Sequence, residues 1–491
     1  MINNQNKKII ASYAVVFITS LLMALNAATF PFSSRVTGAD SSVFIYIAKT
    51  ILSGEMPYLD TFDHKGPVLY LINAFGLLIS DRIGIWLLEY ITILITFVFS
   101  YKIARLLGCN EIGACAVVVI NAIVLNCYFE GGNLVEEYAC FFITISLYLF
   151  LQFFKTSHTS AWKIILCGAS FAAVLLLRIN MVVLWAVMCI GVLVYNIKNG
   201  DVKKTIGFIF WFLLGIALVC IPIMLWLWKN QALIPFVDNY LLFNFMYASD
   251  SSTASISNIG RAVIHFCTGS PLVFTIPILA YFCFSKKEIA DWLCFVSLGL
   301  SLLSMSISGR TYAHYGMILC PLVVYAVSRA FVELDTKLFS LSQISKRQKL
   351  SVALSIFCAI ILLFLQPIKT MAGNILYIPL KSNSSTEWHE IAEIVTENTN
   401  KSDLITVCGN RNIVYLLSDR KSASKYSYQY PIAEINPNIK TEYLDDIRQL
   451  KAKMIIVEKD YFLYDDIMDV VEQNYMLLET INSTHIYLRN S

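Results

Sequence analysis

The chain has 491 residues, of which 57% are hydrophobic and only 14% are charged, and its formal net charge is +3. Soluble domains average about 25% charged residues, so the composition excludes a water-soluble protein. The small net charge does not indicate nucleic-acid binding, and we expect no nucleic acid among the partners.

Membrane spans are predicted where apolar runs approach the length of about 20 residues that crosses a bilayer. The first run follows Lys7 and Lys8, and we expect it to be a retained helix rather than a signal peptide, because it is long and many others follow. About eleven spans are expected on this criterion. They cover residues 9–29, 83–106, 112–128, 138–154, 162–177, 181–196, 206–228, 262–283, 290–308, 315–332 and 350–367.

Residues 66–79 are apolar but too few to cross a bilayer, so we predict a re-entrant or interfacial helix there. The positive-inside rule supports this prediction, because every cluster of Lys and Arg between spans then falls on one side. The expected protein is a multi-pass plasma-membrane protein with a cytoplasmic N-terminus. The cytoplasmic clusters are Lys7/Lys8, Lys102/Arg105, Lys155/Lys163, Lys198/Lys203/Lys204, Lys286/Lys287 and Lys337/Lys346/Arg347/Lys349.

The opposite, outer side receives the unusual polar segments. These are the first outer loop with its juxtamembrane helices (30–80) and the segments 133–137, 178–180, 229–260, 309–315 and 369–491. Unusual polar residues are therefore segregated from the ordinary topogenic lysines, which indicates a functional outer face.

The composition changes after about residue 380, where helical stretches alternate with short β-branched runs. We predict helices at 388–398, 413–417, 443–450 and 464–473, and strands at 404–407, 454–457 and 485–488. The chain thus divides into a transmembrane domain, 1–368, and a small soluble extracytoplasmic α/β domain, 380–491. Of the 13 cysteines only Cys408 lies in this polar tail, so no disulfide framework is expected there.

The first outer loop carries the densest group of polar residues beside the membrane, namely Asp40, Asp60, Asp63, His64 and Lys65. Asp40 opens a helix-like segment, where it could be an N-cap; a carboxylate held in this way could also act as a general base for an acceptor hydroxyl. Lys65 could be an interfacial lysine, or the cation that a phosphate leaving group needs.

Further candidates lie in the other outer segments. Arg310 and His314 are four residues apart, so they would share a face if the segment is helical, and Tyr315 follows them. Glu136 and Glu137 stand at the start of a predicted span, where acidic residues also suit the helix dipole.

A charge inside the membrane is costly, so Arg178 should face a cavity, the outer interface or a partner. Glu136 or Glu137 could be that partner. Glu89 also lies inside a predicted span, so its charge needs a similar environment. No phosphate-binding loop, GxGxxG, HExxH or paired CxxC motif is visible, so the sequence shows no nucleotide site.

Several of these residues resemble motifs of the GT-C glycosyltransferases. The closest branch groups the bacterial relatives of dolichyl-phosphate-mannose protein mannosyltransferases with the lipid A aminoarabinose transferase. The matching residues are Asp40, Tyr46, Ala48, Gly54, Pro57-Tyr58, Asp60 and His64-Lys65-Gly66-Pro67-Val68-Leu69-Tyr70 in the first loop, then Gly309-Arg310, Tyr312 and His314-Tyr315, and Cys408 to Arg420 in the tail.

The resemblance implies an inverting transfer of one sugar from a polyprenyl-phosphate donor to a cell-envelope acceptor on the outer face. By motif, Asp40 corresponds to the catalytic carboxylate, and Lys65 to the lysine of a Lys-Pro-Pro pattern, here Lys-Gly-Pro, that contacts the lipid phosphate. Protein-mannosylating members carry two adjacent acidic residues where this chain has Asp40-Ser41, which argues against protein mannosylation.

We assign the remaining candidates around these two residues. Arg310, His314 and Tyr315 would help Lys65 to bind the donor phosphate. The cavity and acceptor site would be shaped by Asp60, Asp63, His64, Glu136, Glu137 and Arg178. Some relatives bind a divalent metal ion; Asp40, Glu136 and His314 are candidate ligands here.

Other classes of protein remain open at this point. A transporter or lipid flippase would place polar groups near the bilayer midplane in two related halves, whereas these cluster at the outer edge without a visible repeat. An envelope-polymer ligase or polymerase would carry arginines in a large outer loop, but residues 229–260 contain only Lys229 and no arginine. A non-catalytic binding protein is conceivable if the outer domain is the functional part.

Overall fold

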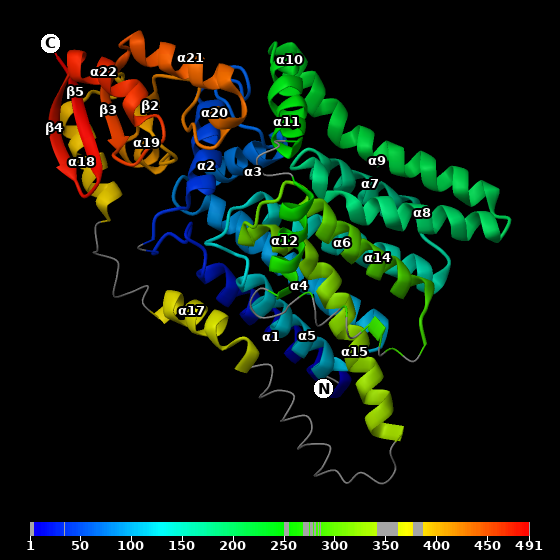
Figure 1. The fold of residues 1–491 in the computed structure, drawn as a ribbon. Coiled ribbons are helices and arrows are strands. Elements are labelled where there is room, and N and C mark those ends of the chain that lie inside the picture. Colours follow the sequence, from blue (N-terminus) through cyan, green and yellow to red (C-terminus); the bar gives the residue numbers. More distant parts are fainter. Residues whose placement is uncertain are drawn as a thin grey trace. The chain divides into compact units, whose positions relative to one another are not determined.

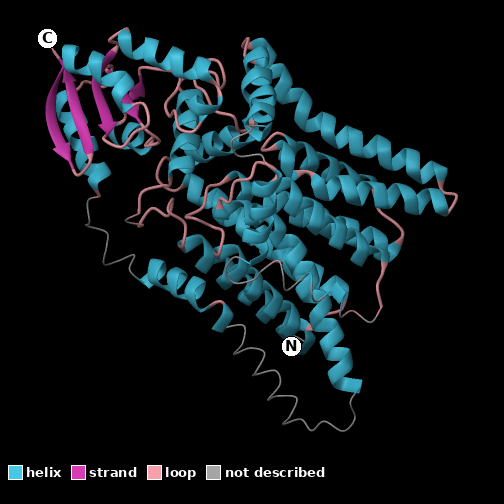
Figure 2. Cartoon of the chain, viewed as in Figure 1, coloured by secondary structure: helices cyan, strands magenta, loops and turns pink. Residues whose placement is uncertain are grey.

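The computed structural model describes residues 4–33, 35–249, 255–268, 274, 278, 281–282, 284, 286–340, 362–376 and 386–490 (Figure 1). Its described residues form mostly helices, with one small sheet near the C-terminal end of the chain (Figure 2). They divide into two compact units. The first takes its residues from 1–30, 86–222 and 251–377, and the second from 31–85, 223–250 and 378–491.

Six described helical segments are long and apolar enough to cross a membrane, which confirms a multi-pass helical membrane protein. They are α1 (Asn4–Leu25), α4 (Gly84–Leu107), α6 (Val135–Thr156), α9 (Val202–Lys229), α14 (Ile289–Ser306) and the continuous stretch of η3 (Ala313–Leu319) and α15 (Cys320–Ser340). Shorter apolar helices are α3 (Pro67–Ile79), α5 (Glu111–Asn126), α7 (Ala161–Leu175) and α8 (Val183–Lys198).

These helices lie within a few residues of the predicted spans, but the number of spans stays a prediction. Helix α12 (Ile256–Thr268) covers only the first part of the predicted span 262–283, and most of the rest of that span lies outside the described residues. Likewise, α17 (Leu365–Leu376) overlaps the end of the span 350–367, whose residues 350–361 lie outside them, as do Lys346, Arg347 and Lys349.

Helix α6 is the central helix of the first unit. It contacts α7, α8, α14, α15 and η3, and most of its side chains are buried. Helices α7 and α9 approach closely because glycines face the partner backbone. A Cβ atom on Gly168 would lie 2.1 Å from the carbonyl oxygen of Phe212, and one on Gly215 would lie 2.2 Å from that of Ile165.

In the second unit, α2 (Ala39–Leu52) packs on α3. Helix α3 begins at Pro67 directly after its N-cap Gly66, and its 13 residues confirm the predicted short helix. Three short helical turns follow the end of α9: α10 (Leu233–Phe236), the π-helix η2 (Val237–Leu242) and α11 (Phe243–Ser249).

The C-terminal part of the second unit is an α/β fold around a five-stranded sheet of order β2-β1-β3-β5-β4. Strand β1 pairs in parallel with β2 and β3, and β5 pairs antiparallel with β3 and β4. The strands are β1 (Leu404–Cys408), β2 (Lys421–Ser422), β3 (Ala452–Glu458), β4 (Tyr475–Ile481) and β5 (Thr484–Arg489), and the helices are α18 (Glu387–Asn398), α19 (Ile413–Ser418), α20 (Ile432–Ile435), α21 (Pro437–Arg448) and α22 (Tyr464–Asn474).

The predicted helices and strands of the tail are confirmed, but the prediction missed the short elements β2 and α20 as well as strand β4, and it placed the start of α21 too late. Strand β4 was not predicted, because it is an edge strand whose Met476 and Leu477 are exposed, so its pattern does not alternate. Helix α21 begins earlier than predicted, at Pro437, with the side chain of Asn436 accepting a hydrogen bond from the Asn438 amide. This Asn-Pro start was a readable signal in the sequence.

The same unit joins this α/β fold to the first outer loop. Helix α19 contacts α2, and the amide of Ser422 donates a 2.8 Å hydrogen bond to the hydroxyl of Tyr46. The amide of Phe62 likewise donates to the carbonyl of Lys425, at 2.8 Å. The division at residues 368 and 380 stays a prediction, but the first outer loop and the tail are parts of one compact unit.

Candidate functional site

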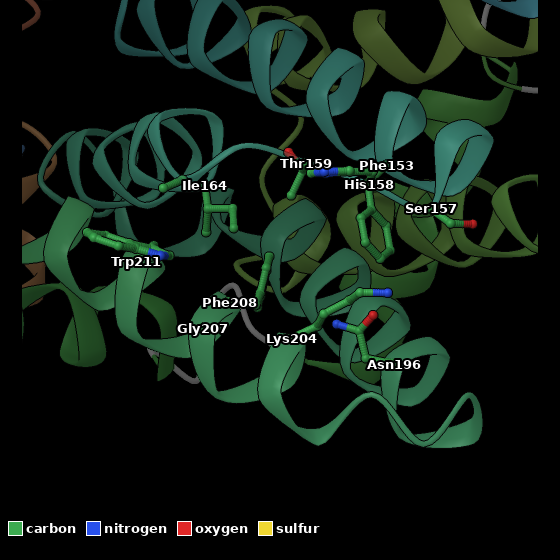
Figure 3. Close-up of a pocket in the computed structure, with 11 residues that line it drawn as sticks. Phe153, Ser157, His158, Thr159, Ile164, Asn196, Lys204, Gly207, Phe208 and Trp211 are labelled. Atoms are coloured by element: carbon green, nitrogen blue, oxygen red, sulfur yellow. The ribbon is translucent and has the colours of Figure 1, made fainter.

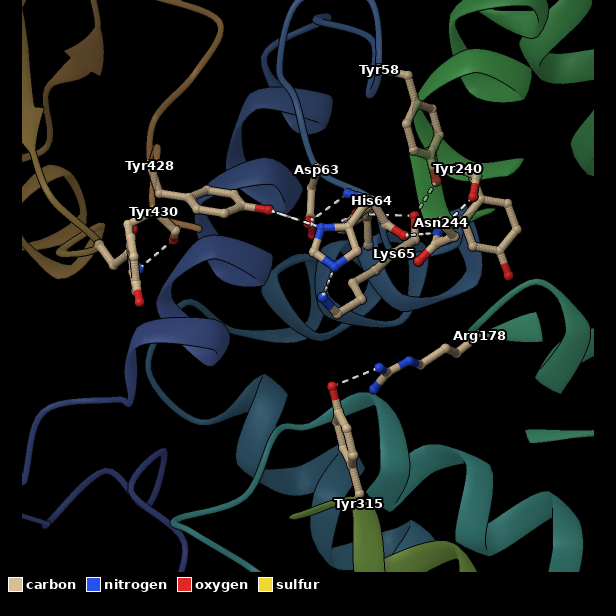
Figure 4. Close-up of polar contacts among 12 residues, drawn as sticks. Tyr58, Asp63, His64, Lys65, Arg178, Tyr240, Asn244, Tyr315, Tyr428 and Tyr430 are labelled. Carbon is tan, nitrogen blue, oxygen red and sulfur yellow. Dashed lines mark hydrogen bonds and ion pairs between the residues drawn. The ribbon is translucent and has the colours of Figure 1, made fainter. Parts of the chain in front are cut away.

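The predicted site residues of the second unit gather where the first outer loop meets α3. We call Asp63, His64, Lys65, Tyr70 and Tyr428 the loop cluster. Four of them come from the first outer loop and α3, and Tyr428 comes from the segment between β2 and α20. Figure 4 labels Asp63, His64, Lys65 and Tyr428.

Asp63 is the buried centre of the loop cluster, with only 2% of its surface exposed. Its carboxylate accepts hydrogen bonds from the hydroxyls of Tyr70 and Tyr428, each at 2.7 Å, and from the amide of His64 at 2.7 Å. A carboxylate engaged in this way holds its neighbours in place and is poorly suited to remove a proton from a substrate.

His64 connects Asp63 to Lys65. Its Nε2 lies 2.8 Å from the Lys65 ammonium, while its Nδ1 lies 3.4 Å from an Asp63 oxygen and 3.3 Å from the Tyr428 hydroxyl. Because an ammonium can only donate, Nε2 must accept, so the neutral ring carries its proton on Nδ1 toward Asp63. The imidazole also stacks on Tyr247, with centroids 5.2 Å apart.

The backbone at Lys65 is held from several directions. Its carbonyl accepts a hydrogen bond from the hydroxyl of Tyr58, at 2.7 Å, and lies 3.2 Å from the hydroxyl of Tyr70, whose single hydrogen it shares with Asp63. From α11, the amide group of Asn244 donates to the carbonyl of His64 at 2.7 Å. The cation at Lys65 is therefore presented on a backbone with little freedom to move, which is what a preorganised phosphate contact requires.

Asp40 is exposed in the first turn of α2, and the N-cap of that helix is Gly38, so the N-cap prediction for Asp40 is wrong. A carboxylate at this position still gains from the helix dipole. Burial, then the charge and hydrogen bond of Asp63, then the charge of Asp40, raise the pKa of Tyr428 well above its ordinary value. Tyr428 therefore remains a donor to Asp63, and Asp40 lies close enough to act on it.

Asp60 is not part of the loop cluster. It is exposed, and its carboxylate accepts a 2.7 Å hydrogen bond from the amide of Met56, which closes a turn within the loop. This contact is local, and a role of Asp60 in shaping the acceptor site stays a prediction.

The first unit holds a second group, which we call the arginine cluster: Arg178, Glu136 and Tyr315. Arg178 Nη1 lies 2.6 Å from Glu136 Oε1. Arg178 Nη2 donates to the Tyr315 hydroxyl at 2.8 Å, as Figure 4 shows. Both charged side chains are mostly buried, with 12% and 2% of their surface exposed. Glu136 is thus the partner of Arg178 that the sequence left open, and its carboxylate balances the buried guanidinium.

His314 lies beside this cluster, in η3. Its Nδ1 is 2.7 Å from the carboxylate of Glu130, and its ring stacks on Tyr312 and meets Tyr315 edge-on. Arg310 lies before η3 in a non-helical segment, so the helical relation considered for Arg310 and His314 does not exist. Instead, His314 and Tyr315 are consecutive residues of η3, and their rings are in edge-to-face contact.

Glu137 and Glu89 converge on one backbone donor. The amide of Asn133 lies 2.6 Å from a Glu89 oxygen and 2.8 Å from a Glu137 oxygen, and the Thr29 hydroxyl also donates to Glu89. A Cβ atom on Gly132, whose φ is +80°, would lie 2.3 Å from Glu89. These buried carboxylates therefore hold the turn before α6 in place, which agrees with a shaping role for Glu137.

Metal binding finds little support in the described part of the chain, where no three His, Cys, Asp or Glu side chains converge. Two of the candidate ligands have other partners: Glu136 pairs with Arg178, and His314 with Glu130. This donor set does not fit a divalent cation, and we derive no step through a metal.

The sequence did not identify Tyr428, Asn244 or Tyr247 as site residues. All three contact Asp63 or His64 from segments at least 180 residues away along the chain. Only Tyr58 and Tyr70 carried a local signal, since both lie in the first-loop motif.

Solved structures with a similar fold cover almost the whole chain. ArnT from Cupriavidus metallidurans, solved with bound undecaprenyl phosphate, aligns with a TM-score of 0.60 and 11% identity over 97% of this chain and 97% of its own. The oligosaccharyltransferase AglB from Archaeoglobus fulgidus, solved with an inhibitory peptide and a dolichol-phosphate, aligns with a TM-score of 0.53 and 12% identity over 98% of this chain and 74% of its own. Both are GT-C membrane glycosyltransferases, so the predicted GT-C-like fold is confirmed.

Comparison of sequences, rather than of folds, identifies the family of the chain. No curated protein sequence matches the chain. Two family models do match, described as "Putative competence-induced protein Ccs4 N-terminal domain", over residues 3–377, and "Putative competence-induced protein Ccs4 C-terminal domain", over residues 385–489. The chain therefore belongs to the Ccs4 family.

Proposed function

We propose that this protein is an inverting glycosyltransferase that moves a sugar from a polyprenyl-phosphate donor to a cell-envelope acceptor on the outer face of the plasma membrane. The GT-C fold supports the proposal, since the similar structures of ArnT and AglB contain undecaprenyl phosphate and a dolichol-phosphate. The observation that carries it is the ammonium of Lys65, 2.8 Å from His64 Nε2 on a backbone held by Tyr58 and Tyr70.

Lys65 would bind the donor phosphate. A departing phosphate is a weak base, so it needs cations and hydrogen-bond donors rather than a general acid. His64 engages one of the three ammonium hydrogens, which leaves others to donate to phosphate oxygens. Asp63 holds the imidazole in the tautomer that accepts from Lys65, so Asp63 and His64 are positioning residues for the cation.

Asp40 would act on the acceptor. Its carboxylate is exposed in the first turn of α2, and no described side chain or amide donates to it. It takes the proton of the acceptor hydroxyl while the acceptor oxygen bonds to the anomeric carbon and the phosphate leaves with the electron pair of the broken bond. One displacement of this kind inverts the anomeric centre.

The first unit would supply the remaining roles. Because the charge of Arg178 is balanced by Glu136, we assign this pair and Glu137 to shaping the cavity rather than to binding phosphate. Arg310, His314 and Tyr315 remain proposed donor-phosphate contacts. The Tyr315 hydroxyl accepts from Arg178, which leaves its own hydrogen free to donate to a phosphate oxygen.

The test is sugar transfer in envelope membranes that contain the full-length protein, with a panel of labelled polyprenyl-phosphate sugars. We expect label to leave one donor for a larger acceptor, and Lys65→Ala to raise the apparent KM for that donor. Lys49→Ala is the matched control, because Lys49 is a half-exposed lysine of the same unit that pairs with Asp419. Intact donor with every sugar, or an unchanged KM in Lys65→Ala, would contradict the proposal.

A further inference from the structure

A cavity lies in the first unit, at the ends of α6 and α8 and the beginnings of α7 and α9. Its volume is about 240 Å³, and Figure 3 shows the residues around it. It is lined by the apolar side chains of Phe153, Ile164, Phe208 and Trp211 and the polar side chains of Ser157, His158, Thr159, Asn196 and Lys204. None of these residues has a role in the proposed reaction.

This cavity is remote from the arginine cluster. Glu136 lies in the first turn of α6 and Phe153 lies in the last, and a helix of 22 residues is about 33 Å long. Arg178 lies between α7 and α8, at the same end of the helices as Glu136. The cavity is therefore a separate site at the other end of these helices, the end that the lysine clusters predict to be cytoplasmic.

Asn196 is the strongest indication that the cavity takes a polar ligand. Only 2% of its surface is exposed, it lines the cavity, and no hydrogen bond to its side-chain amide is found among the described residues. The amide is buried within the protein but faces the cavity, so a ligand or water in the cavity completes its hydrogen bonds. The exposed side chain of His158 and the half-buried side chain of Thr159 line the same space.

The charge of the site favours an anion. Lys204 reaches the cavity, and its ammonium pairs with Asp201 at 2.6 Å. Unlike the buried pair of Arg178 and Glu136, this pair is well exposed and therefore weak, and two ammonium hydrogens remain for a ligand. Side chains of Asn196 and Lys204, from α8 and α9, point into the same space below the ring of Phe153 (Figure 3). Further lysines, at 155, 163, 198 and 203, belong to the same ends of these helices. Amide, hydroxyl, imidazole and ammonium donors together suit phosphate oxygens.

The surroundings indicate that the phosphate belongs to a lipid. Helix α9 is long enough to span the membrane, and next to the cavity its Ile206 and Phe210 are 63% and 57% exposed, as expected for side chains that face lipid. Trp162, at the beginning of α7, is 61% exposed, which is typical of the membrane interface. The cavity is also smaller than the roughly 300–1,000 Å³ of sites for drug-sized ligands, so it suits a headgroup better than a nucleotide sugar.

We propose that this cavity binds the phosphate headgroup of an anionic phospholipid, with Asn196 and Lys204 as its main contacts and with Phe208 and Trp211 against the glycerol and the first methylenes of the chains. The inference does not depend on the glycosyltransferase proposal, since it concerns a different end of the helices and predicts binding rather than catalysis.

The experiment compares lipid retention by full-length protein and variants. The protein is purified in detergent, stripped of lipid and titrated with phosphatidylglycerol, with phosphatidylcholine or with inorganic phosphate, and bound lipid is counted by native mass spectrometry. Loss of one charge-assisted hydrogen bond should weaken phosphatidylglycerol binding about tenfold in Lys204→Ala and in Asn196→Leu. Lys203→Ala and Asn199→Leu are matched controls, because both residues are exposed neighbours that do not line the cavity.

Equal retention of phosphatidylglycerol in Lys204→Ala and Lys203→Ala would overturn the proposal, and so would equal retention of phosphatidylcholine. If inorganic phosphate raises the unfolding temperature but phosphatidylglycerol is not retained, the site binds a soluble anion and the proposal is overturned. Since Asn196→Leu could affect folding, its thermal transition without lipid must match that of the unmodified protein, and Lys204→Ala provides the independent test.

Discussion

The hydroxyl of Tyr428 donates a 2.7 Å hydrogen bond to the carboxylate of Asp63, across 365 positions of sequence. Through this contact the α/β part of the second unit takes part in holding the first outer loop, where His64 and Lys65 lie. The loop therefore depends on a residue of the tail for its geometry, and the tail is more than an appended domain.

Tyr428→Phe should destabilise the second unit by about 1.5–3 kcal/mol, because it removes a hydrogen bond to a buried carboxylate. Urea titration of the full-length protein in detergent measures this loss of unfolding free energy. Tyr426→Phe is the control. Its hydroxyl donates to Glu442, whose side chain is 52% exposed, so water replaces the lost bond and the effect should be smaller. Equal losses of stability in the two variants would contradict the greater importance of a hydrogen bond to the buried Asp63.

Substitutions of His64 should separate positioning from folding. His64→Gln keeps an acceptor near Nε2 and should preserve the apparent donor KM, whereas His64→Leu removes it and should raise KM about tenfold, the effect of losing one charge-assisted hydrogen bond. Steady-state kinetics with whichever sugar donor the panel experiment selects measures both KM values. If His64→Leu lowers only the amount of folded protein and leaves KM unchanged, His64 has a structural role and does not position Lys65.

Substituting only one member of the buried pair Arg178 and Glu136 should lower the free energy of unfolding more than substituting both. Glu136→Gln leaves the guanidinium without its counter-charge and should cost about 3–5 kcal/mol, while Arg178→Met with Glu136→Leu together should cost less. Thermal unfolding of the three proteins in detergent compares them. A double variant at least as unstable as Glu136→Gln would show that the pair stabilises the fold by more than mutual neutralisation.

Cys408 should be inert to thiol reagents in the folded protein. Burial raises its pKa to about 12, although a hydrogen bond from Tyr443 acts in the opposite direction, so almost no thiolate exists at pH 8. Its raised pKa contributes stability that is complete below pH 9, the ordinary value for the thiol, and is lost as pH rises toward 12. Maleimide labelling with peptide mapping, with and without urea, measures this protection. Rapid labelling of Cys408 in folded protein would contradict its burial.

The sequence could predict most helices and the core of the tail, because apolar length and β-branched runs are local signals. Helix α3 is one example, since Gly66 and Pro67 mark its beginning and its length excludes a span. Strand β4 escaped prediction because an edge strand with exposed Met476 and Leu477 has no alternating pattern. The N-cap of α2 lies two residues before the predicted Asp40, at Gly38, which has no side chain to mark it.

The candidate site was predictable only in part. Lys65 and His64 lie in one short motif, and the ion pair of Arg178 followed from the cost of a buried charge. Tyr428, Asn244 and Tyr247 reach the same loop from distant segments, and nothing in their own neighbourhoods marks them. The relation of Arg310 to His314 depended on helical geometry that the backbone before η3 does not have.

The most direct test of the proposed reaction is release of polyprenyl phosphate from a labelled donor in envelope membranes containing Asp40→Asn. Asparagine keeps the size of the side chain but cannot take the acceptor proton, so we predict that transfer is abolished while expression and the unfolding temperature are unchanged. Asp81→Asn, an exposed carboxylate of the same unit outside the proposed site, should transfer at the rate of the unmodified protein. Full transfer by Asp40→Asn would contradict the mechanism.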